Sequence, residues 1–366
     1  MKRNLQIDFL RFCGVFLVMI NHIIILGDSP LDRLLNVIKT GGWVGVDLFF
    51  VLSGYLVSGL IIKEYQIFNS FNPKRFLIRR GFKIYPSYYL FIGFSYIFFT
   101  YLTKEPQTKS GLFHEAIFVS NYLNFNNQHT WSISVEEHFY FFLSVLFFLL
   151  IKFKQIKLRT FLFTYIVVFI VGFSCRLHNY LIYNNYDFAR DYVKSHYRFD
   201  ALFFGVLLSF VTNYRKEVID SILTHTSRIF ILTLSFIFVS SNFFLKRDDY
   251  PIISVINLSI NPICFGFILI NNIAYTKEKF LKIISPLSYI GKYSYSIYLF
   301  HTIFMAIAIH VFKGGGVKYY ISYLALAISG GIFISKLVEY PLISFREKYF
   351  PSKSGKPTTE LKLGKL

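Results

Sequence analysis

Runs of about 20 apolar residues recur along the whole sequence and are separated by short polar segments. A helix needs about this many apolar residues to cross the hydrocarbon core of a bilayer. We therefore predict an all-α integral membrane protein with about ten transmembrane helices. Their expected ranges are residues 7–26, 43–62, 85–103, 133–151, 161–181, 199–213, 229–245, 252–273, 293–312 and 319–338.

The basic residues are distributed unevenly between the two sets of connecting segments. One set holds most of them, including the groups at residues 74–83 and 152–159, whereas the other set holds few, such as Arg33 and Lys104. Cytoplasmic loops carry the excess of Lys and Arg. We therefore expect both termini in the cytoplasm. We also expect residues 1–345 to form one membrane domain and residues 346–366 to form a basic, polar, disordered cytoplasmic tail that is attracted to anionic membrane lipid.

The N-terminus resembles a secretory signal because Lys2 and Arg3 precede an apolar run. Asp8 and Arg11 interrupt that run, however, and no small-residue cleavage site follows His22. We expect the segment to be retained as the first helix.

Composition agrees with the membrane assignment: hydrophobic residues make up 54% of the chain and charged residues 16%, against about 25% charged in soluble domains. The net charge of +19 would suit nucleic acid, but the basic residues lie in short loops between apolar runs, so no nucleic-acid partner is expected. Cys13, Cys175 and Cys264 are too widely spaced to indicate a disulfide framework or a metal site. With no room for a soluble catalytic domain, any chemistry is expected in or beside the membrane.

The first predicted helix carries Arg11 and His22, eleven residues apart. At 100° per residue, the two lie within about 20° of one helix face and roughly 16 Å apart along the axis. One interpretation is a snorkelling arginine with an interfacial histidine. The other is a catalytic imidazole that accepts a proton at neutral pH.

Asp47 follows three glycines at the start of the second predicted helix. A charge inside a membrane helix is unfavourable by roughly 2.5–3.5 kcal/mol on insertion scales, so it usually has a partner or a function. Asp47 and His22 are expected at the same depth, where a carboxylate would orient the imidazole. The alternative is a carboxylate favoured by the helix dipole in the headgroup region.

Basic residues gather in "PKRFLIRRGFKIYPSYY", residues 73–89, at the start of the third predicted helix. They set topology in the ordinary interpretation, but guanidinium groups also suit a nucleotide diphosphate. No Gly-rich phosphate loop is present, so side chains would have to bind the phosphates.

The segment "HTWSISVEEHFYFF", residues 129–142, places Glu136 and Glu137 beside each other in the fourth predicted helix. They point about 100° apart, so at most one faces a given partner. Helix capping, with Ser132 or Ser134 as the N-cap, is the alternative function of this segment. Weaker signals are Arg198 in "RFDALFFG" and His301 in "YSYSIYLFH", where a packing histidine is the favoured alternative.

Taken in order, these motifs resemble the membrane-bound acyltransferase-3 family, bacterial enzymes that O-acylate surface glycans. The resemblance rests on "IDFLRFCGVFLVMINH", "WVGVDLFFVLSGYLVSG", "RRGFKIYPSYY", "TWSISVEEHFYF", "RFDALFFG", "GKYSYSIYLFH" and "VEYP", which cover residues 7 to about 345. It implies a multi-pass protein of the bacterial cytoplasmic (inner) membrane. It leaves a monomer and a homodimer both open.

The resemblance also implies roles for individual residues. The expected catalytic residues are His22, Asp47 and Glu136. The residues expected to bind the cytoplasmic acyl-CoA donor are Arg11, Arg75, Arg79, Arg80 and Lys83. A weaker expectation assigns acceptor binding to Trp131, Ser132, Glu137, Arg198 and His301. Two positions depart from the pattern, because Phe9 replaces a glycine and Lys83 replaces an arginine, which removes one bidentate phosphate fork.

The resulting hypothesis is an O-acyltransferase that moves an acetyl or short acyl group from acetyl-CoA to a hydroxyl of a polysaccharide or lipid-linked glycan, without a metal. His22 acts as the general base or as an acyl relay. The alternative is a glycan or small-molecule transporter or flippase without covalent chemistry. Transporters also place ionisable groups at mid-membrane, but no matched pair of broken helices is visible in the two halves of the sequence.

Overall fold

The structure is a computed structural model that describes residues 4–222, 224–312 and 315–353. These residues form helices joined by loops, with no strand among them. The α-helices are α1 (Leu5–His22), α2 (Pro30–Gly41), α3 (Val44–Phe68), α4 (Pro73–Ile97), α5 (Lys109–Ala116), α6 (Trp131–Lys152), α7 (Leu158–Tyr183), α8 (Phe188–Asp191), α9 (Phe199–Tyr214), α10 (Lys216–Ile222), α11 (His225–Ser241), α12 (Ile252–Ala274), α13 (Glu278–Gly291), α14 (Ser294–Val311), α15 (Gly316–Ile334) and α16 (Tyr340–Tyr349). Short 3₁₀ or π segments are η1 (Phe98–Leu102), η2 (Gln128–Thr130), η3 (Ser195–Tyr197) and η4 (Ser335–Glu339).

The outer helices expose apolar side chains, as a bilayer requires. Phe163 on α7, Phe230 on α11 and Phe333 on α15 are each more than 60% exposed. Within the described residues, seven helical segments are long and apolar enough to cross a membrane, and they contain α1, α3, α6, α7, α12, α14 and α15. The prediction of an all-α, multi-pass membrane protein is therefore confirmed.

Each of the ten predicted ranges overlaps one of these helices or one of α4, α9 and α11. The helices α9 and α11 are apolar but shorter than the seven. The exact number of crossings and the cytoplasmic side of the termini stay predictions.

Small residues let α3 and α9 pack closely. A Cβ atom on Gly54 would lie 1.8 Å from the carbonyl oxygen of Leu202, and one on Gly205 would lie 2.2 Å from that of Val51. Glycine contacts of this kind allow membrane helices to approach backbone to backbone. The contact brings the first turn of α9 beside the first turn of α3.

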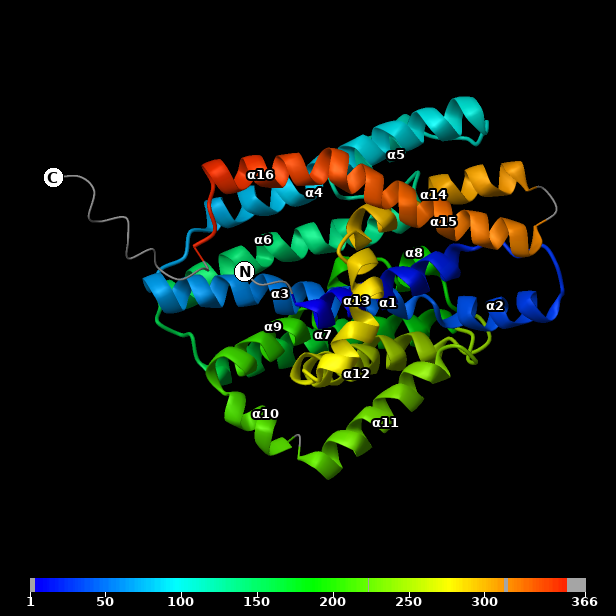
Figure 1. The fold of residues 1–366 in the computed structure, drawn as a ribbon. Helices are drawn as coiled ribbons and strands as arrows, with labels where there is room; N and C mark the ends of the chain where they lie inside the picture. Colours follow the sequence, from blue (N-terminus) through cyan, green and yellow to red (C-terminus); the bar gives the residue numbers. More distant parts are fainter. Residues whose placement is uncertain (1–3, 223, 313–314, 354–366) are drawn as a thin grey trace.

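The helix α1 lies inside the bundle, in contact with α2, α3, α13 and α14. The helix α13 runs across the long helices rather than along them (Figure 1). It approaches α1 at Gly291, where a Cβ would lie 1.8 Å from the carbonyl oxygen of Asp8.

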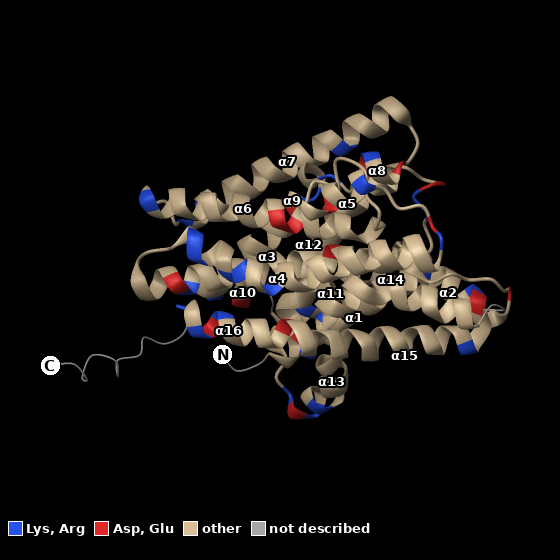
Figure 2. Cartoon of the chain, turned by 90° about the horizontal axis from the view of Figure 1, so that it is seen from above, with Lys and Arg blue, Asp and Glu red and all other residues tan. Residues whose placement is uncertain are grey.

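Charged residues are sparse along the middle of the long helices and gather toward their ends (Figure 2). We call the end where α3 ends, α4 begins and α6 ends the basic end. The far end holds α2, α8 and the last residue of α1, His22. The predicted tail begins within α16, which continues to Tyr349, and residues 354–366 lie outside the described part of the chain.

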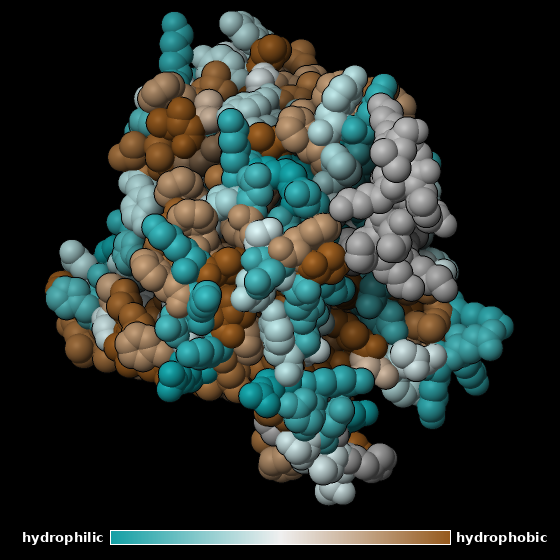
Figure 3. Space-filling view, turned by 90° about the vertical axis from the view of Figure 1, so that its left-hand side faces the viewer, coloured by the Kyte–Doolittle hydropathy of each residue, from teal (hydrophilic) through white to brown (hydrophobic). Residues whose placement is uncertain are grey.

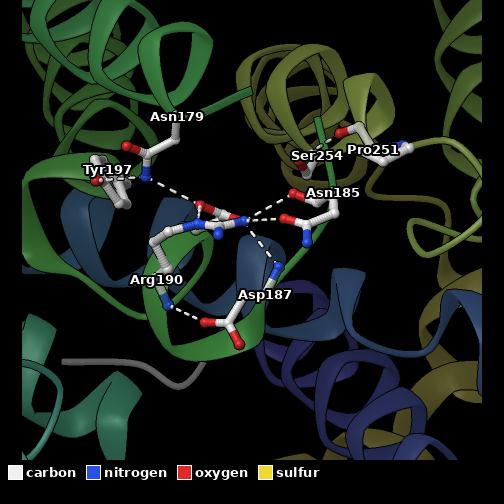
Figure 4. A network of polar contacts seen from close by, with 8 residues as sticks. Asn179, Asn185, Asp187, Arg190, Tyr197, Pro251 and Ser254 are labelled. Carbon is white, nitrogen blue, oxygen red and sulfur yellow. Dashed lines mark hydrogen bonds and ion pairs between the residues drawn. The ribbon is translucent and has the colours of Figure 1, made fainter. Parts of the chain in front are cut away.

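A polar network fixes the loop between α7 and α9 at the far end (Figure 4). Arg190 donates from Nε to Asp191 at 2.8 Å and from Nη2 to the carbonyl oxygen of Asn185 at 2.8 Å. Asn179 on α7 donates to Asp191 and to the hydroxyl of Tyr197, both at 3.0 Å. The loop that leads to Arg198 is therefore held against α7.

Candidate active site

A cavity of about 680 Å³ opens among the helices of the basic end. Its lining includes eight basic residues and two acidic ones, Asp8 and Glu64. The basic residues are Arg11, Lys63, Arg75, Arg79, Arg80, Lys83, Arg346 and Lys353. Hydrophilic side chains lie across the centre of this end of the molecule (Figure 3). We call this space the basic cavity, and all five residues predicted to bind acyl-CoA line it.

The basic side chains of this cavity differ in whether a carboxylate neutralises them. Arg75 pairs with Glu64 at 2.5 Å, and Arg79 pairs with Glu347 at 2.8 Å. In the described part of the chain, no carboxylate lies within 4.0 Å of the charged nitrogens of Arg80 or Lys83. Of the five residues predicted to bind acyl-CoA, these two therefore carry the charge that is most available to an anion, because Arg11 also has a carboxylate neighbour, Asp8, at 3.6 Å.

A second space of about 120 Å³, which we call the middle cavity, continues inward from the basic cavity. The two have Arg11, Leu56, Arg80 and Lys83 in common. Glu136 of α6 lines the middle cavity. Glu136 accepts hydrogen bonds from the hydroxyls of Tyr140 and Ser53, the latter at 3.3 Å.

A third space of about 210 Å³ lies toward the far end and is lined by His22 and His129, so we call it the histidine cavity. It has Val46 and Tyr298 in common with the middle cavity. The three cavities therefore form a row from the basic cluster to His22. At the join, the hydroxyls of Tyr298 and Ser132 lie 2.6 Å apart.

Backbone carbonyl groups determine which ring nitrogen carries the hydrogen in His22 and in its neighbour His301. Nδ1 of His22 lies 2.9 Å from the carbonyl oxygen of Val18, and Nδ1 of His301 lies 2.6 Å from that of Tyr298. A carbonyl oxygen only accepts, so both Nδ1 atoms carry hydrogen. Neutral His301 then has a lone pair on Nε2, which lies 3.3 Å from Nδ1 of His22.

This arrangement leaves Nε2 of neutral His22 unprotonated and able to accept a proton. A proton taken there would give an imidazolium whose Nδ1–H is already held by Val18 and His301. His129 lies close to both rings, with its centroid 5.0 Å from that of His301 and 6.1 Å from that of His22. The site thus contains a base, His22, whose ring orientation is fixed by the contacts of its Nδ1 atom.

The expected partner of His22 is corrected by these contacts. Asp47 is fully buried and forms an ion pair with Arg198 of the α9 N-terminus, and its second oxygen accepts a hydrogen bond from Asn261 of α12 at 3.1 Å. A permanent guanidinium charge is a stronger partner for a buried carboxylate than a neutral imidazole. Asp47 is therefore bound to α9 and α12 instead of orienting His22.

Glu136 does not take that place either, because its partners are Tyr140 and Ser53 in the middle cavity. Glu137 points elsewhere and accepts a hydrogen bond from Tyr85 at 3.0 Å. Of the residues predicted to bind the acceptor, Trp131 lines the histidine cavity and Ser132 lines the middle cavity, whereas Arg198 is buried behind them against Asp47.

The sequence profile of one family, described as an acyltransferase domain, matches residues 4–336. That range includes every residue that lines the middle and histidine cavities, and every residue that lines the basic cavity except Arg346, Ser352 and Lys353. The chain belongs to the acyltransferase-3 family. The prediction of an acyltransferase is confirmed at the level of the family, and nothing in the match favours the transporter alternative.

Relatives of this acyltransferase-3 protein carry compatible names. A Staphylococcus aureus (strain COL) protein named "putative O-acetyltransferase" is 28% identical over an alignment of 322 residues that covers 79% of this chain and 50% of the relative. The O-acetyltransferase OatA of Staphylococcus aureus (strain NCTC 8325 / PS 47) is 29% identical over 290 residues, 72% of this chain and 46% of the relative. The chain spans about half the length of the curated relatives it matches. No solved structure matches it.

Three residues of this acyltransferase-3 site escaped the sequence analysis. His129 precedes the motif "TWSISVEEHFYF" by one residue, so its position beside a recognised segment was a usable signal. Arg247 and Asn261 gave none, because an arginine in a loop and an asparagine in an apolar helix have many ordinary uses. Only the packing of α12 against α3 brings Asn261 to Asp47.

Proposed function

We propose that the protein is an integral-membrane O-acyltransferase that moves an acetyl or other short acyl group from cytoplasmic acyl-CoA to a hydroxyl of a surface polysaccharide or a lipid-linked glycan. The observation that carries the proposal is the row of three cavities between the basic cluster and His22. The basic end faces the cytoplasm in this proposal, and the membrane is the bacterial cytoplasmic membrane.

The donor binds first, with its phosphates in the basic cavity. Arg80 and Lys83 are suited to this because, in the described residues, neither has a carboxylate within 4.0 Å, while Arg11, Arg75 and Arg79 add to the positive potential. The narrower middle cavity then receives the uncharged thioester arm, and its polar groups, Ser53 and Glu136 among them, contact that arm.

The acceptor hydroxyl enters the histidine cavity. Nε2 of His22 takes the hydroxyl proton while the oxygen attacks the thioester carbon. The carbon–sulfur bond breaks, and the departing CoA thiolate receives the proton from His22, so the base is regenerated. His301 acts as a positioning residue because it holds Nδ1–H of His22.

A transient acyl-His22 is the alternative course of the same reaction. Here Nε2 of His22 attacks the thioester carbon, the carbon–sulfur bond breaks, and CoA leaves as the thiolate. The acceptor oxygen then attacks the acyl carbon, and the bond from this carbon to Nε2 breaks. Nε2 takes the hydroxyl proton and passes it to the CoA thiolate, which leaves the imidazole neutral. A denaturing quench at neutral pH without acceptor separates the two courses, because only the second leaves labelled acetyl on the protein and an acyl-imidazole would hydrolyse in acid.

The test follows labelled acetyl from acetyl-CoA into glycan in inverted membrane vesicles. General-base catalysis contributes about 10²–10⁴-fold, so His22→Ala should lower transfer by at least about 100-fold at matched membrane abundance. His310→Ala is the matched control, because His310 is exposed on α14 and should transfer normally. Near-normal transfer by His22→Ala would remove His22 from the mechanism.

A further inference from the structure

Arg247, in the loop between α11 and α12, lines the histidine cavity together with His22 of α1. Its guanidinium carbon lies 4.4 Å from the ring centre of Trp43, 4.6 Å from that of Tyr186 and 4.6 Å from that of Tyr192. Contacts with ring faces hold the cation in place without using its N–H groups as hydrogen-bond donors to an acid. Three aromatic rings thus fix the position of a charged side chain in a loop.

Part of the Arg247 guanidinium has no hydrogen-bond acceptor within the protein. Its Nη1 atom is buried and has no hydrogen-bond partner, and within the described ranges no carboxylate lies within 4.0 Å of the group. Asp47, the buried acid behind this cavity, is already paired with Arg198 and Asn261. A buried cationic donor without an acceptor is unfavourable, so the site is suited to an anion supplied from outside.

The rest of the cavity lining suits a sugar. Trp43, Trp131 and Tyr192 contribute aromatic side chains to the lining, while the amide of Gln128 and the side-chain oxygen of Asn21 can bind hydroxyls. A glycan here would therefore meet aromatic side chains, neutral polar groups and one unpaired positive charge. The charge distinguishes an acidic sugar from a neutral one.

We propose that Arg247 binds an anionic group of the acceptor, a carboxylate or a phosphate, so that the acceptor is an acidic glycan. The inference rests on the proposed function, which places the acceptor hydroxyl beside His22. Guanidinium groups bind both anions through two parallel hydrogen bonds. Arg247 would thereby set which glycans are acylated and orient the hydroxyl toward Nε2 of His22.

Intrinsic fluorescence can test this binding without any acyl transfer, because the chain has two tryptophans, Trp43 and Trp131, and both line the histidine cavity. The full chain in detergent micelles is titrated with methyl glucuronide, methyl glucoside 6-phosphate and neutral methyl glucoside. We expect at least one anionic glycoside to shift the emission at a concentration about tenfold or more below that needed by the neutral one. A response to the uronide alone or to the phosphate alone identifies which anion the acceptor carries.

Arg247→Gln should remove the preference for the anion, weakening its binding about 10- to 100-fold, while Arg247→Lys should keep part of it. Arg33→Gln is the matched control, because Arg33 is exposed and pairs with Asp28 on the loop before α2. If Arg247→Gln does not elute as a single species, Arg247→Lys decides the question. Equal responses to anionic and neutral glycosides, or an unchanged preference in the Arg247 variants, would overturn the inference.

His22→Ala separates this inference from the proposed function. The variant should lose acyl transfer yet keep the fluorescence response to the anion. If the unmodified protein transfers no acyl group but responds to the anion, the proposed function is contradicted and the anion site stands.

Discussion

At the scale of single residues, the chemistry depends on where protons and charges sit around His22. Backbone carbonyl groups fix the tautomers of His22 and His301, and Nε2 of His301 lies 3.3 Å from Nδ1 of His22. In the proposed mechanism, His301 takes the orienting role that was expected of Asp47. A neutral partner is adequate here because it only has to accept the hydrogen that His22 keeps on Nδ1.

Replacing His301 by alanine should lower kcat for acyl transfer about 10- to 100-fold, because one hydrogen bond to the imidazolium is lost. The KM for acetyl-CoA should stay the same, since the donor phosphates bind at the other end of the row. His301→Gln should recover part of kcat because its amide oxygen can accept the same hydrogen bond. The measurement is steady-state transfer in vesicles with His310→Ala as control, and an unchanged kcat in His301→Ala would contradict the role.

At the scale of helices, the buried ion pair between Asp47 and Arg198 connects α3 to α9, and Asn261 adds α12. Gly54 and Gly205 let α3 and α9 approach closely, and this approach brings Asp47 within reach of Arg198. The guanidinium of Arg198 also packs on the ring of Tyr192 at 4.7 Å, and Tyr192 packs on Trp131 at 4.9 Å. The pair therefore supports the aromatic wall of the histidine cavity.

Asp47→Asn should destabilise the protein by about 3–5 kcal/mol, because it leaves Arg198 as an uncompensated buried charge. Adding Arg198→Met should restore part of that stability, since both charges are then absent. Thermal unfolding of purified protein in detergent measures both effects. An Asp47→Asn variant as stable as the parent would show that the ion pair does not hold these helices together.

At the scale of the whole molecule, three cavities lie in a row from the basic end to the histidines, and neighbouring cavities have lining residues in common. Most of the basic side chains of the row lie at one end, and the histidines lie at the other end together with Arg247. This separation suits a donor with a phosphate-rich head and an acceptor that arrives from the opposite side.

Leu56 lines both the basic and the middle cavity, so a bulky residue there should block the donor arm. Leu56→Trp should lower kcat/KM for acetyl-CoA by at least about tenfold, because the thioester no longer reaches His22. Leu181→Trp is the control, as Leu181 is 71% exposed on the outer face of α7. Equal kcat/KM values for the two variants in the vesicle assay would argue against passage of the donor through the middle cavity.

The sequence by itself determined the helical membrane class, the approximate positions of the helices, the family and the group of basic residues at one end. These properties follow from local apolar runs and from motifs whose residues are close in the chain, and both can be identified without knowing how helices pack. Only the tertiary structure decided the partners of the buried groups. His22 meets His301 and Asp47 meets Arg198 across 279 and 151 positions of the chain, and Arg247 reaches the same cavity from a third segment. Such pairs depend on helix contacts such as that of Gly54 with the backbone of α9, because a buried charge takes the strongest partner that packing places within reach.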